Sequence, residues 1–289
     1  MPFRFFCYII IAIVIIQFPS ISQSQETDPD DNSNGETLPE VVVTATRTES
    51  DRQRLPYIVD TVASDDMSNK SLFASSDLMP ELSGFNMYRG GGYGAPSVLS
   101  FRGADKSHTL FLIDGIPISN PFFGSADVES LTLFGFDKIE IVKTDQSVLY
   151  GTEAVNGVVN FRTDPQPTPA TATLLGRVGN FGLFETGARV SGKNNDNDDA
   201  YSLAVLETEI AGRRDDEHFH ALHVSGYESL WATDSLNVTT TLRFLDTRKE
   251  LSQDIIFDPA AEQLRMVKDK NREFFTKAFS VAFWRNTPC

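Results

Sequence analysis

The stretch from Val98 to Thr163, VLSFRGADKSHTLFLIDGIPISNPFFGSADVESLTLFGFDKIEIVKTDQSVLYGTEAVNGVVNFRT, decides the fold. Short runs of β-branched and aromatic residues alternate in it with turn residues, a pattern typical of buried strands. Strands are expected at residues 109–113 (TLFLI), 139–142 (IEIV) and 157–161 (GVVNF). The first of these is almost entirely apolar, which predicts cover on both faces, and Asp114-Gly115 behind it is a strong tight-turn dipeptide. The stretch predicts a compact mixed α+β domain at residues 55–163.

The composition changes after residue 163. Residues 164–169 (DPQPTP) form a proline-rich hinge, because proline cannot continue a sheet. Apolar and polar residues then alternate in segments of about ten residues, the signature of strands that cross a membrane in a β-barrel. We expect about six such strands within residues 170–289, a partial barrel. A soluble β-meander is the alternative interpretation.

The N-terminus has the pattern of an export signal. Arg4 is followed by a nearly unbroken apolar run at 5–18, which is shorter than the roughly 20 residues that a membrane-spanning helix needs. Small residues at 22–24 (SQS) suit a cleavage site, so residues 1–24 are predicted to be a signal peptide. Residues 25–54 begin as an acidic, polar segment without apolar period, and we interpret them as a flexible leader.

Composition argues against several function classes. The chain has 40 acidic and 25 basic residues, a net charge of −15, whereas nucleic-acid binding needs a basic footprint. Of its two cysteines, Cys7 lies in the predicted signal peptide, so the mature chain has no pair to form a disulfide. The four histidines suggest no catalytic arrangement with Ser, Cys or paired carboxylates. We therefore expect no enzyme, no nucleic-acid partner and no organic cofactor.

Several motifs of the central stretch occur together in one known family. They are 101–103 (FRG), 113–115 (IDG), 139–140 (IE), 149–151 (LYG) and 157–160 (GVVN). In this combination the chain resembles the plug domain of TonB-dependent outer-membrane receptors, especially those of the vitamin B12 (cobalamin) type. It departs from the family at 143–145, where KTD replaces the usual Arg-Gly-Pro turn. The resemblance implies an α+β plug domain followed by the first antiparallel strands of an incomplete transmembrane β-barrel.

The resemblance also implies a function. Receptors of this kind import a large scarce nutrient, of the cobalamin or siderophore class, through the Gram-negative outer membrane, with the plug gating the pore. The expected partners are a TonB-type energy-coupling protein, the nutrient ligand and outer-membrane lipid. Because family members have about 22 strands, we interpret the chain as the N-terminal portion of such a receptor. The alternative is a truncated or free periplasmic plug-like interaction domain without transport activity.

The segment just before the domain resembles a TonB box. Its residues are Glu40, Val41, Val42, Val43, Thr44, Ala45 and Thr46. In the family this segment pairs by strand addition with the energy-coupling protein, a mode that relies on main-chain hydrogen bonds and an exposed extended edge. The alternative is that it is simply the first strand of the globular domain.

Two sets of loop residues are candidate binding sites by the same resemblance. The substrate-binding candidates on the outward-facing plug loops are Tyr93, Ser119, Asn120, Phe122 and Phe123. The two phenylalanines could instead fill the core. Some vitamin B12 receptors hold calcium in outer barrel loops, and the candidates by position are Asp215, Asp216, Asp246 and Asp254, the last two in a predicted loop at 246–271. Ordinary solvated acidic residues are the alternative.

Overall fold

The computed structural model describes residues 41–42, 44, 50–51, 56–70, 74–89, 97–120, 125–163, 165, 170–194, 199–212, 217–233, 236–250, 254–258, 263–267 and 273–286. The chain divides into two units, 1–38 and 39–289, and all described residues belong to the second. The predicted signal peptide lies outside them. Within the described ranges, none of the helices is long and apolar enough to span a membrane.

The central stretch forms a five-stranded sheet. Its strands are β3 (Val59–Ala63), β11 (Lys138–Val142), β12 (Gly157–Arg162), β7 (Thr109–Ile113) and β8 (Ile116–Pro117), in that spatial order. β12 and β7 run parallel, and the other neighbours are antiparallel. Every residue of β7 is buried, so the predicted cover on both faces is confirmed.

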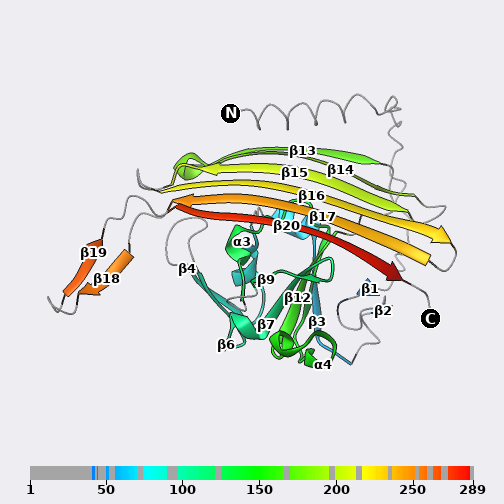
Figure 1. Ribbon diagram of the computed structural model, residues 1–289, viewed down its shortest axis with the longest axis horizontal. Helices are drawn as coiled ribbons and strands as arrows, with labels where there is room; N and C mark the ends of the chain where they lie inside the picture. The colour runs from blue at the N-terminus through cyan, green and yellow to red at the C-terminus, as the bar shows by residue number, and fades with distance from the viewer. Residues whose placement is uncertain are drawn as a thin grey trace, which may run out of the picture. The chain divides into compact units, whose positions relative to one another are not determined.

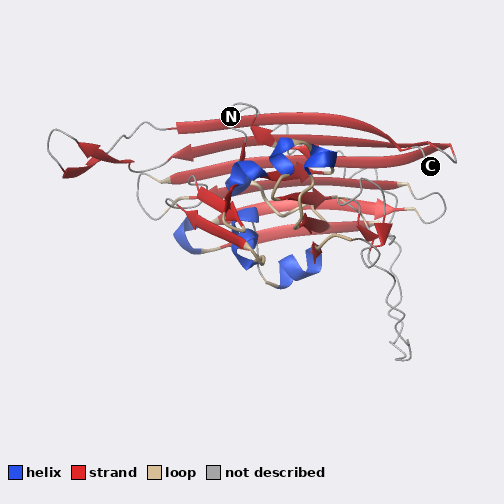
Figure 2. Ribbon diagram, turned by 90° about the horizontal axis from the view of Figure 1, so that it is seen from below, coloured by secondary structure: helices blue, strands red, loops and turns tan. Residues whose placement is uncertain are grey.

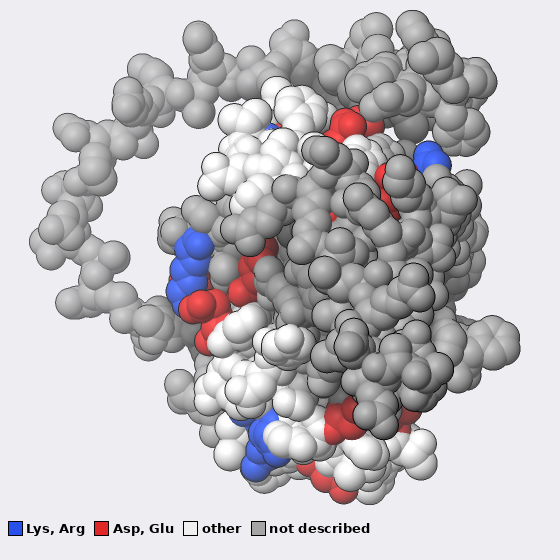
Figure 3. Space-filling model, turned by 90° about the vertical axis from the view of Figure 1, so that its left-hand side faces the viewer, with Lys and Arg blue, Asp and Glu red and all other residues white. Residues whose placement is uncertain are grey.

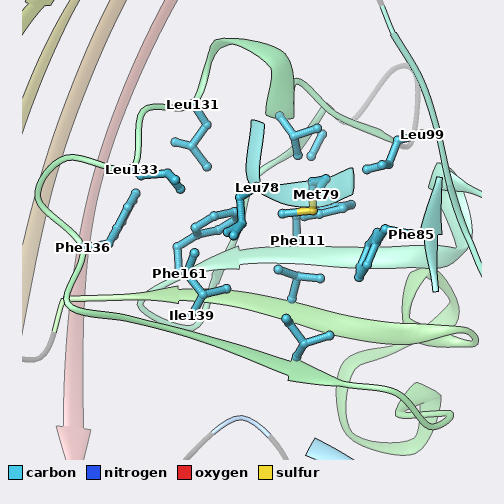
Figure 4. Close-up of a cluster of buried hydrophobic side chains, with 14 of the residues drawn as sticks. Leu78, Met79, Phe85, Leu99, Phe111, Leu131, Leu133, Phe136, Ile139 and Phe161 are labelled. Carbon is cyan, nitrogen blue, oxygen red and sulfur yellow. The ribbon is translucent and has the colours of Figure 1, made fainter. Parts of the chain in front are cut away.

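Alternate side chains of this sheet enter two separate apolar clusters. One face carries Phe111, Ile139 and Phe161, which pack with residues of the short helices such as Leu78 and Met79 (Figure 4). The opposite face carries a smaller cluster with members Val59, Leu110, Leu112, Val142, Ala154 and Val158, and Val42 from far upstream belongs to it. Burial on both faces fixes the register of the sheet, because a slip by one residue would exchange the two sets of side chains.

Short elements complete the α+β domain (residues 56–163). The helices are α2 (Ser64–Asn69), α3 (Ser75–Leu78) and α4 (Ser147–Tyr150), with 3₁₀ turns η2 (Met79–Glu81), η3 (Lys106–His108), η4 (Val128–Ser130) and η5 (Thr152–Ala154). β4 (Phe85–Arg89), β5 (Ser97–Phe101) and β6 (Ala104–Asp105) form a second sheet, and β9 (Ser119–Asn120) pairs with β10 (Ser125–Ala126). Asp114 and Gly115 both have positive φ, 48° and 82°, as a type I′ hairpin turn requires.

The downstream strands form one antiparallel sheet, the strand sheet. Its members, in spatial order, are β13 (Thr171–Val178), β14 (Phe184–Lys193), β15 (Ala200–Ile210), β16 (His218–Thr233), β17 (Leu236–Glu250) and β20 (Glu273–Asn286). A further 3₁₀ turn, η6 (Asn180–Gly182), connects β13 to β14. Figure 1 shows the six strands side by side, and Figure 2 shows the same continuous sheet from below. The sheet does not close on itself, in agreement with the predicted incomplete barrel.

Two details of the strand sheet correct the sequence interpretation. β16 and β17 have 16 and 15 residues, longer than the expected ten, because their ladder continues to Thr233 and to Glu250 beyond the alternating segments. Asp246 therefore lies inside β17, opposite Leu222 and Lys277, and not in an outer loop. The segment predicted as a plain loop also contains a separate hairpin, β18 (Asp254–Asp258) with β19 (Gln263–Val267).

Apolar and polar residues alternate between the two faces of the strand sheet. β15 alternates along its whole length between fully buried and more exposed positions. On the outer face, large apolar side chains are strongly exposed, with Leu174 at 83% and Val178 at 79%. This outward apolar face is the arrangement expected for strands that meet lipid. On the face shown in Figure 3, the described basic and acidic side chains are interspersed rather than gathered into a basic stripe.

Candidate functional site

Thr44, in the predicted box segment, is bound by three elements of the α+β domain. Its backbone N–H and its hydroxyl both donate to Glu140 Oε2 of β11, at 2.8 and 2.5 Å. Asn160 of β12 donates from Nδ2 to the Thr44 hydroxyl oxygen at 2.9 Å. The hydroxyl of Tyr150, at the end of α4, donates to the Thr44 carbonyl at 2.8 Å. The hydrogen-bonding groups of this one residue are thus largely satisfied by the domain.

The strand register explains why these partners meet. Glu140 and Asn160 are direct partners in the β11–β12 ladder, so their side chains project from the same face of the sheet. Val42, two residues before Thr44, packs into the apolar cluster of that face with no exposed surface. β1 (Val41–Val42) also pairs with β2 (Ser50–Asp51). In this conformation the described side chains of Val42 and Thr44 are buried against the domain.

Glu140 is a buried acid in its ionised form. Burial alone would raise its pKa, but the charge of Lys138, the hydrogen bonds from Thr44 and the charge of Arg162 together outweigh burial and lower the pKa. The Lys138 ammonium lies 3.0 Å from Glu140 Oε1. The carboxylate therefore accepts from Thr44 as a charged acceptor, which makes these bonds stronger than bonds between neutral groups.

A second site joins the α+β domain to the strand sheet around Asp114. The backbone N–H of Thr163 donates to Asp114 Oδ1 at 2.6 Å, and Arg243 of β17 donates from Nη2 to Asp114 Oδ2 at 2.7 Å. The same guanidinium donates to the Thr163 hydroxyl at 2.8 Å and lies over the ring of Phe136, 4.6 Å from its centroid. Arg243 thus contacts three separate segments of the domain at once.

Among the described residues, three ion pairs join the domain to the strand sheet, each with its acid on the domain. Besides Asp114 with Arg243, Asp137 accepts from Arg189 Nη2 of β14 at 2.6 Å. Asp127 accepts from Lys249 Nζ of β17 at 3.1 Å. All three basic side chains are mostly buried, so removing the acid that faces one of them would leave a poorly solvated charge without its partner.

The structure describes only part of the predicted binding residues. Ser119 lies in β9 and donates from its hydroxyl to Glu153 Oε2 at 2.7 Å, and Asn120 is the next residue of that strand. The other substrate candidates, Tyr93, Phe122 and Phe123, lie outside the described residues, as do Glu40, Val43, Ala45 and Thr46 of the box segment. These assignments stay predictions.

The calcium candidates are not brought together in the part of the chain that is described. Asp215 and Asp216 lie outside that part, and Asp254 begins the β18–β19 hairpin. Asp246 is an even-numbered residue of β17, so it projects from the face opposite to Arg243 and Lys249. Among the described side chains, no group of three His, Cys, Asp or Glu is placed to hold a metal ion.

Sequence reasoning missed the partners of Thr44 and of the basic strand residues. Glu140 interrupts the apolar, buried run of β11 (IEIV), and Asn160 interrupts that of β12 (VVNF). A polar residue in such a position needs a buried partner, so both were detectable as sites of interest. Their common partner was not, because Thr44 lies 96 residues from Glu140 and 116 from Asn160 in the sequence.

Comparisons with known proteins agree with this architecture. Residues 51–158 match the family model described as TonB-dependent Receptor Plug Domain. The vitamin B12 transporter BtuB of Photobacterium profundum is 29% identical over 174 residues, 60% of this chain and 28% of that protein. BtuB of Vibrio vulnificus is 28% identical over 251 residues, 85% of this chain and 40% of its own length. The chain thus spans less than half the length of these relatives.

Solved structures show the same fold at low sequence identity. A structure of Pseudomonas aeruginosa FpvA bound to heterologous pyoverdines superposes with a TM-score of 0.67 at 18% identity, covering 83% of this chain and 33% of that one. The ferric yersiniabactin uptake receptor FyuA of Yersinia pestis gives 0.54 at 20% identity over 66% of this chain and 32% of its own. None of these descriptions is of an enzyme. With the two-faced sheet and the antiparallel strands behind it, residues 51–158 thus match the plug domain of TonB-dependent receptors, and the chain as a whole is similar to vitamin B12 transporters.

Proposed function

We propose that the chain is the plug and first barrel strands of a receptor that imports a large nutrient through the outer membrane, driven by a TonB-type energy-coupling protein. The binding of Thr44 by Glu140, Asn160 and Tyr150 carries this proposal. It connects the box segment directly to β11 and β12, the centre of the plug sheet, so a pull on the segment acts on the element that fills the pore.

The coupling step requires the box segment to leave the plug. Val42 and Thr44 are fully buried in the docked conformation, and strand addition to a partner needs their backbone groups to be free. Release exposes Val42, and the side chains of Glu140 and Asn160 then form hydrogen bonds with water in place of Thr44. Ligand binding and partner binding then both act by shifting the balance between the docked and released forms, to the extent that each favours one of them.

Cobalamin is the ligand we propose first. The vitamin B12 transporters are 29% and 28% identical to this chain, more than FpvA at 18% and FyuA at 20%. A ferric siderophore is the second candidate, since the structural neighbour FpvA was solved with a bound pyoverdine and FyuA is a ferric yersiniabactin uptake receptor. Tyr93, Ser119, Asn120, Phe122 and Phe123 are the proposed contacts. Aromatic rings offer a large rigid contact area, which suits a wide planar ligand such as a corrin.

The coupling proposal is tested with two substitutions at one position. Val43→Pro removes a backbone donor and breaks an extended ladder, so it should abolish crosslinking to the coupling protein and energy-dependent uptake. Val43→Ile keeps the backbone and should leave both unchanged. Both are measured in the intact receptor. If the two variants behaved alike, the segment would be an ordinary linker, and an interaction domain without transport would become the better interpretation.

The ligand is identified by direct binding to the purified receptor. Labelled cyanocobalamin should bind and a ferric pyoverdine should not, and the reverse result would assign the siderophore class. Phe122→Ala and Phe123→Ala should each weaken binding about thirtyfold without lowering the melting temperature. Adding calcium should tighten binding if Asp215, Asp216 and Asp254 hold the ion. Unchanged affinity in calcium chelator would remove that proposal.

A further inference from the structure

The loop before β11 carries residues 133–137 (LFGFD), which we call the anchor loop. Its last residue, Asp137, accepts from Arg189 of β14 at 2.6 Å. The guanidinium of Arg243 of β17 lies 4.6 Å from the centre of the Phe136 ring. Figure 4 shows Phe136 at the end of the apolar cluster nearest the strands. The loop therefore contacts two strands of the strand sheet that are not neighbours.

The two arginines lie at the same level of the strand sheet. Arg189 pairs with Ala204 in the β14–β15 ladder, and Arg243 pairs with Ser225 in the β16–β17 ladder. Ala204 and Ser225 pair with each other, so the four residues form one continuous row, the wall row. Because neighbouring strands are roughly 4.8 Å apart, the wall row is about 14 Å wide. It has small residues in its middle and a cation at each end.

Gly135 of the anchor loop lies directly against the notch that Ala204 and Ser225 form. A Cβ built on Gly135, whose φ is +98°, would lie 3.2 Å from Ser225 Oγ and 3.3 Å from Ala204 Cβ. The space between the glycine backbone and the wall is therefore too narrow for a water molecule. One residue earlier, Phe134 approaches a second small residue, since a Cβ on Gly187 would lie 3.3 Å from its ring atom Cε1.

The notch has a larger side chain on each side of it along the strands. On the face of the wall row, the next ladder pair in one direction is Leu206 with His223. The next pair in the other direction is Ser202 with Tyr227. A shift of the anchor loop by two residues, about 7 Å, would place the Gly135 backbone against one of these bulkier pairs. The notch thus fixes the position of the loop by shape, in addition to the contacts with the two arginines.

The anchor loop is also continuous with the centre of the plug sheet. The backbone N–H of Asp137 donates to the Arg162 carbonyl at 2.9 Å, at the end of β12. The backbone N–H of Ser64, directly after β3, donates to the Asp137 carbonyl at 2.8 Å. Asp137 itself precedes β11, so the ends of three plug strands meet at the residue that accepts from Arg189. The position of the loop on the wall row therefore sets the position of the sheet.

We propose that the anchor loop and the wall row form a seal, in which the close contact of Gly135 with Ala204 and Ser225 excludes solutes between the plug and strands β14–β17. The seal rests on the proposed function in that it requires a pore through a complete barrel. A pore wide enough for a cobalamin admits smaller solutes wherever plug and wall separate. A dry contact that is held in one position by shape and charge prevents this without a ligand or a coupling protein.

The contact itself is tested first, in purified intact receptor that carries Cys289→Ser. Gly135→Cys with Ala204→Cys should form a disulfide under mild oxidation, because their Cβ atoms lie 3.3 Å apart, close to the usual spacing of about 3.5–4.5 Å. Gly103→Cys with Ala204→Cys is the matched control. Gly103 also has a positive φ, 82°, but nothing lies within 4 Å of a Cβ there, so this pair should stay reduced. Failure of the first pair to oxidise would overturn the contact.

The seal is measured as release of the dye calcein from liposomes that contain the receptor, without ligand or coupling protein. The wild type should retain calcein. Ala204→Leu fills the notch and displaces the anchor loop, so release should be about tenfold faster. Ala188→Leu makes the same change on the opposite face of the sheet, since Ala188 pairs with Val205, and should retain calcein like the wild type. A folded Ala204→Leu receptor that retained calcein equally well would overturn the seal.

A second variant decides the question if Ala204→Leu does not fold. Arg189→Met is added to the receptor with cysteines at positions 135 and 204, where it leaves Asp137 without this cation. The reduced form should release calcein about fivefold faster than the wild type, and oxidation should return release to within about twofold of it. Equal release from the reduced and oxidised forms would overturn the seal.

Uptake of labelled cyanocobalamin by cells is measured separately. A wild-type receptor that gives the expected calcein results but imports no cyanocobalamin would overturn the import proposal and leave the seal in place.

Discussion

Arg243 and Asp114 lie 129 residues apart in the sequence, and their side chains meet at 2.7 Å across the contact between plug and strand sheet. Asp114 belongs to a hairpin turn with positive φ, and Arg243 lies in the middle of β17. The Asp114 side chain is 3% exposed and the Arg243 side chain is 17% exposed. A turn dipeptide that is required locally by β7 and β8 thus also supplies the acceptor for a barrel residue.

Replacing Arg243 by methionine should destabilise the plug against the strand sheet. It removes the cation and leaves the Asp114 carboxylate buried with one remaining donor, the Thr163 N–H, a change that commonly costs about 3 kcal/mol. The free energy of urea-induced plug release, followed by trypsin cleavage of the intact receptor, measures the loss. Arg248→Met is the matched control, because Arg248 lies in the same strand but is 46% exposed and should cost less than about 0.5 kcal/mol. Equal effects of the two variants would contradict the assigned contact.

The sequence allowed prediction of the elements around this contact but not of the contact itself. The apolar run of β7 and the Asp-Gly turn follow from local rules of burial and backbone geometry. Arg243 carries no such local signal, because a basic residue in an alternating strand is equally consistent with any polar surroundings. Its partner depends on how strands from distant parts of the chain are placed in space. Local sequence patterns do not specify that placement.

The same limit applies to the box segment. Its extended character was predictable from three valines and two threonines, but its docking on the plug was not. Docking depends on Glu140 and Asn160 emerging side by side, which follows only once the register of β11 and β12 is known. The β18–β19 hairpin was missed for another reason: each strand has five residues, too few for alternation to be distinguished from an irregular loop.

Gly157 should tolerate no side chain. Its φ is 144°, and a Cβ there would lie 2.4 Å from the Val142 carbonyl oxygen and 3.0 Å from the Phe101 ring. Val142 is the ladder partner of Val158, so the backbone cannot move away without breaking the β11–β12 pairing. Gly157→Ala should therefore cost more than about 3 kcal/mol in plug stability, measured by urea unfolding.

Gly151 provides the comparison for that substitution. It has a positive φ of 89°, but nothing lies within 4 Å of a Cβ built on it. Gly151→Ala meets backbone strain alone and should cost about 1–3 kcal/mol. A result in which the two alanine variants were equally stable would show that the close approach at Gly157 is not the limiting factor.

Thr44→Val should shift the box segment toward its released form. Valine has the shape of threonine but no hydroxyl, so Glu140 loses one donor and the Asn160 amide loses its acceptor. A spin label at Val41 should become more mobile in Thr44→Val, and crosslinking to the coupling protein should increase. Thr44→Ser retains the hydroxyl and should resemble the wild type. Greater label mobility in the serine variant than in the valine variant would count against the hydrogen bonds as the main cause of docking.

Docking of the box segment should also weaken in acid. The pKa of Glu140 is lowered in the docked form, since the charges of Lys138 and Arg162 and the Thr44 hydrogen bonds outweigh burial. Only the Thr44 bonds are lost on release, so docking gains stability from them while Glu140 is ionised. That gain is lost as the pH falls through the lowered pKa, because the protonated acid is no longer a charged acceptor for Thr44. The mobility of the spin label at Val41 should accordingly stay constant near neutral pH and rise once the pH falls into the acid range in which Glu140 binds a proton. Glu140→Gln can still accept from Thr44 but has no proton to gain, so its label mobility should be slightly higher than in the wild type at neutral pH and unchanged in acid. The same acid-induced release in Glu140→Gln would assign the titration to another group and remove Glu140 as the cause.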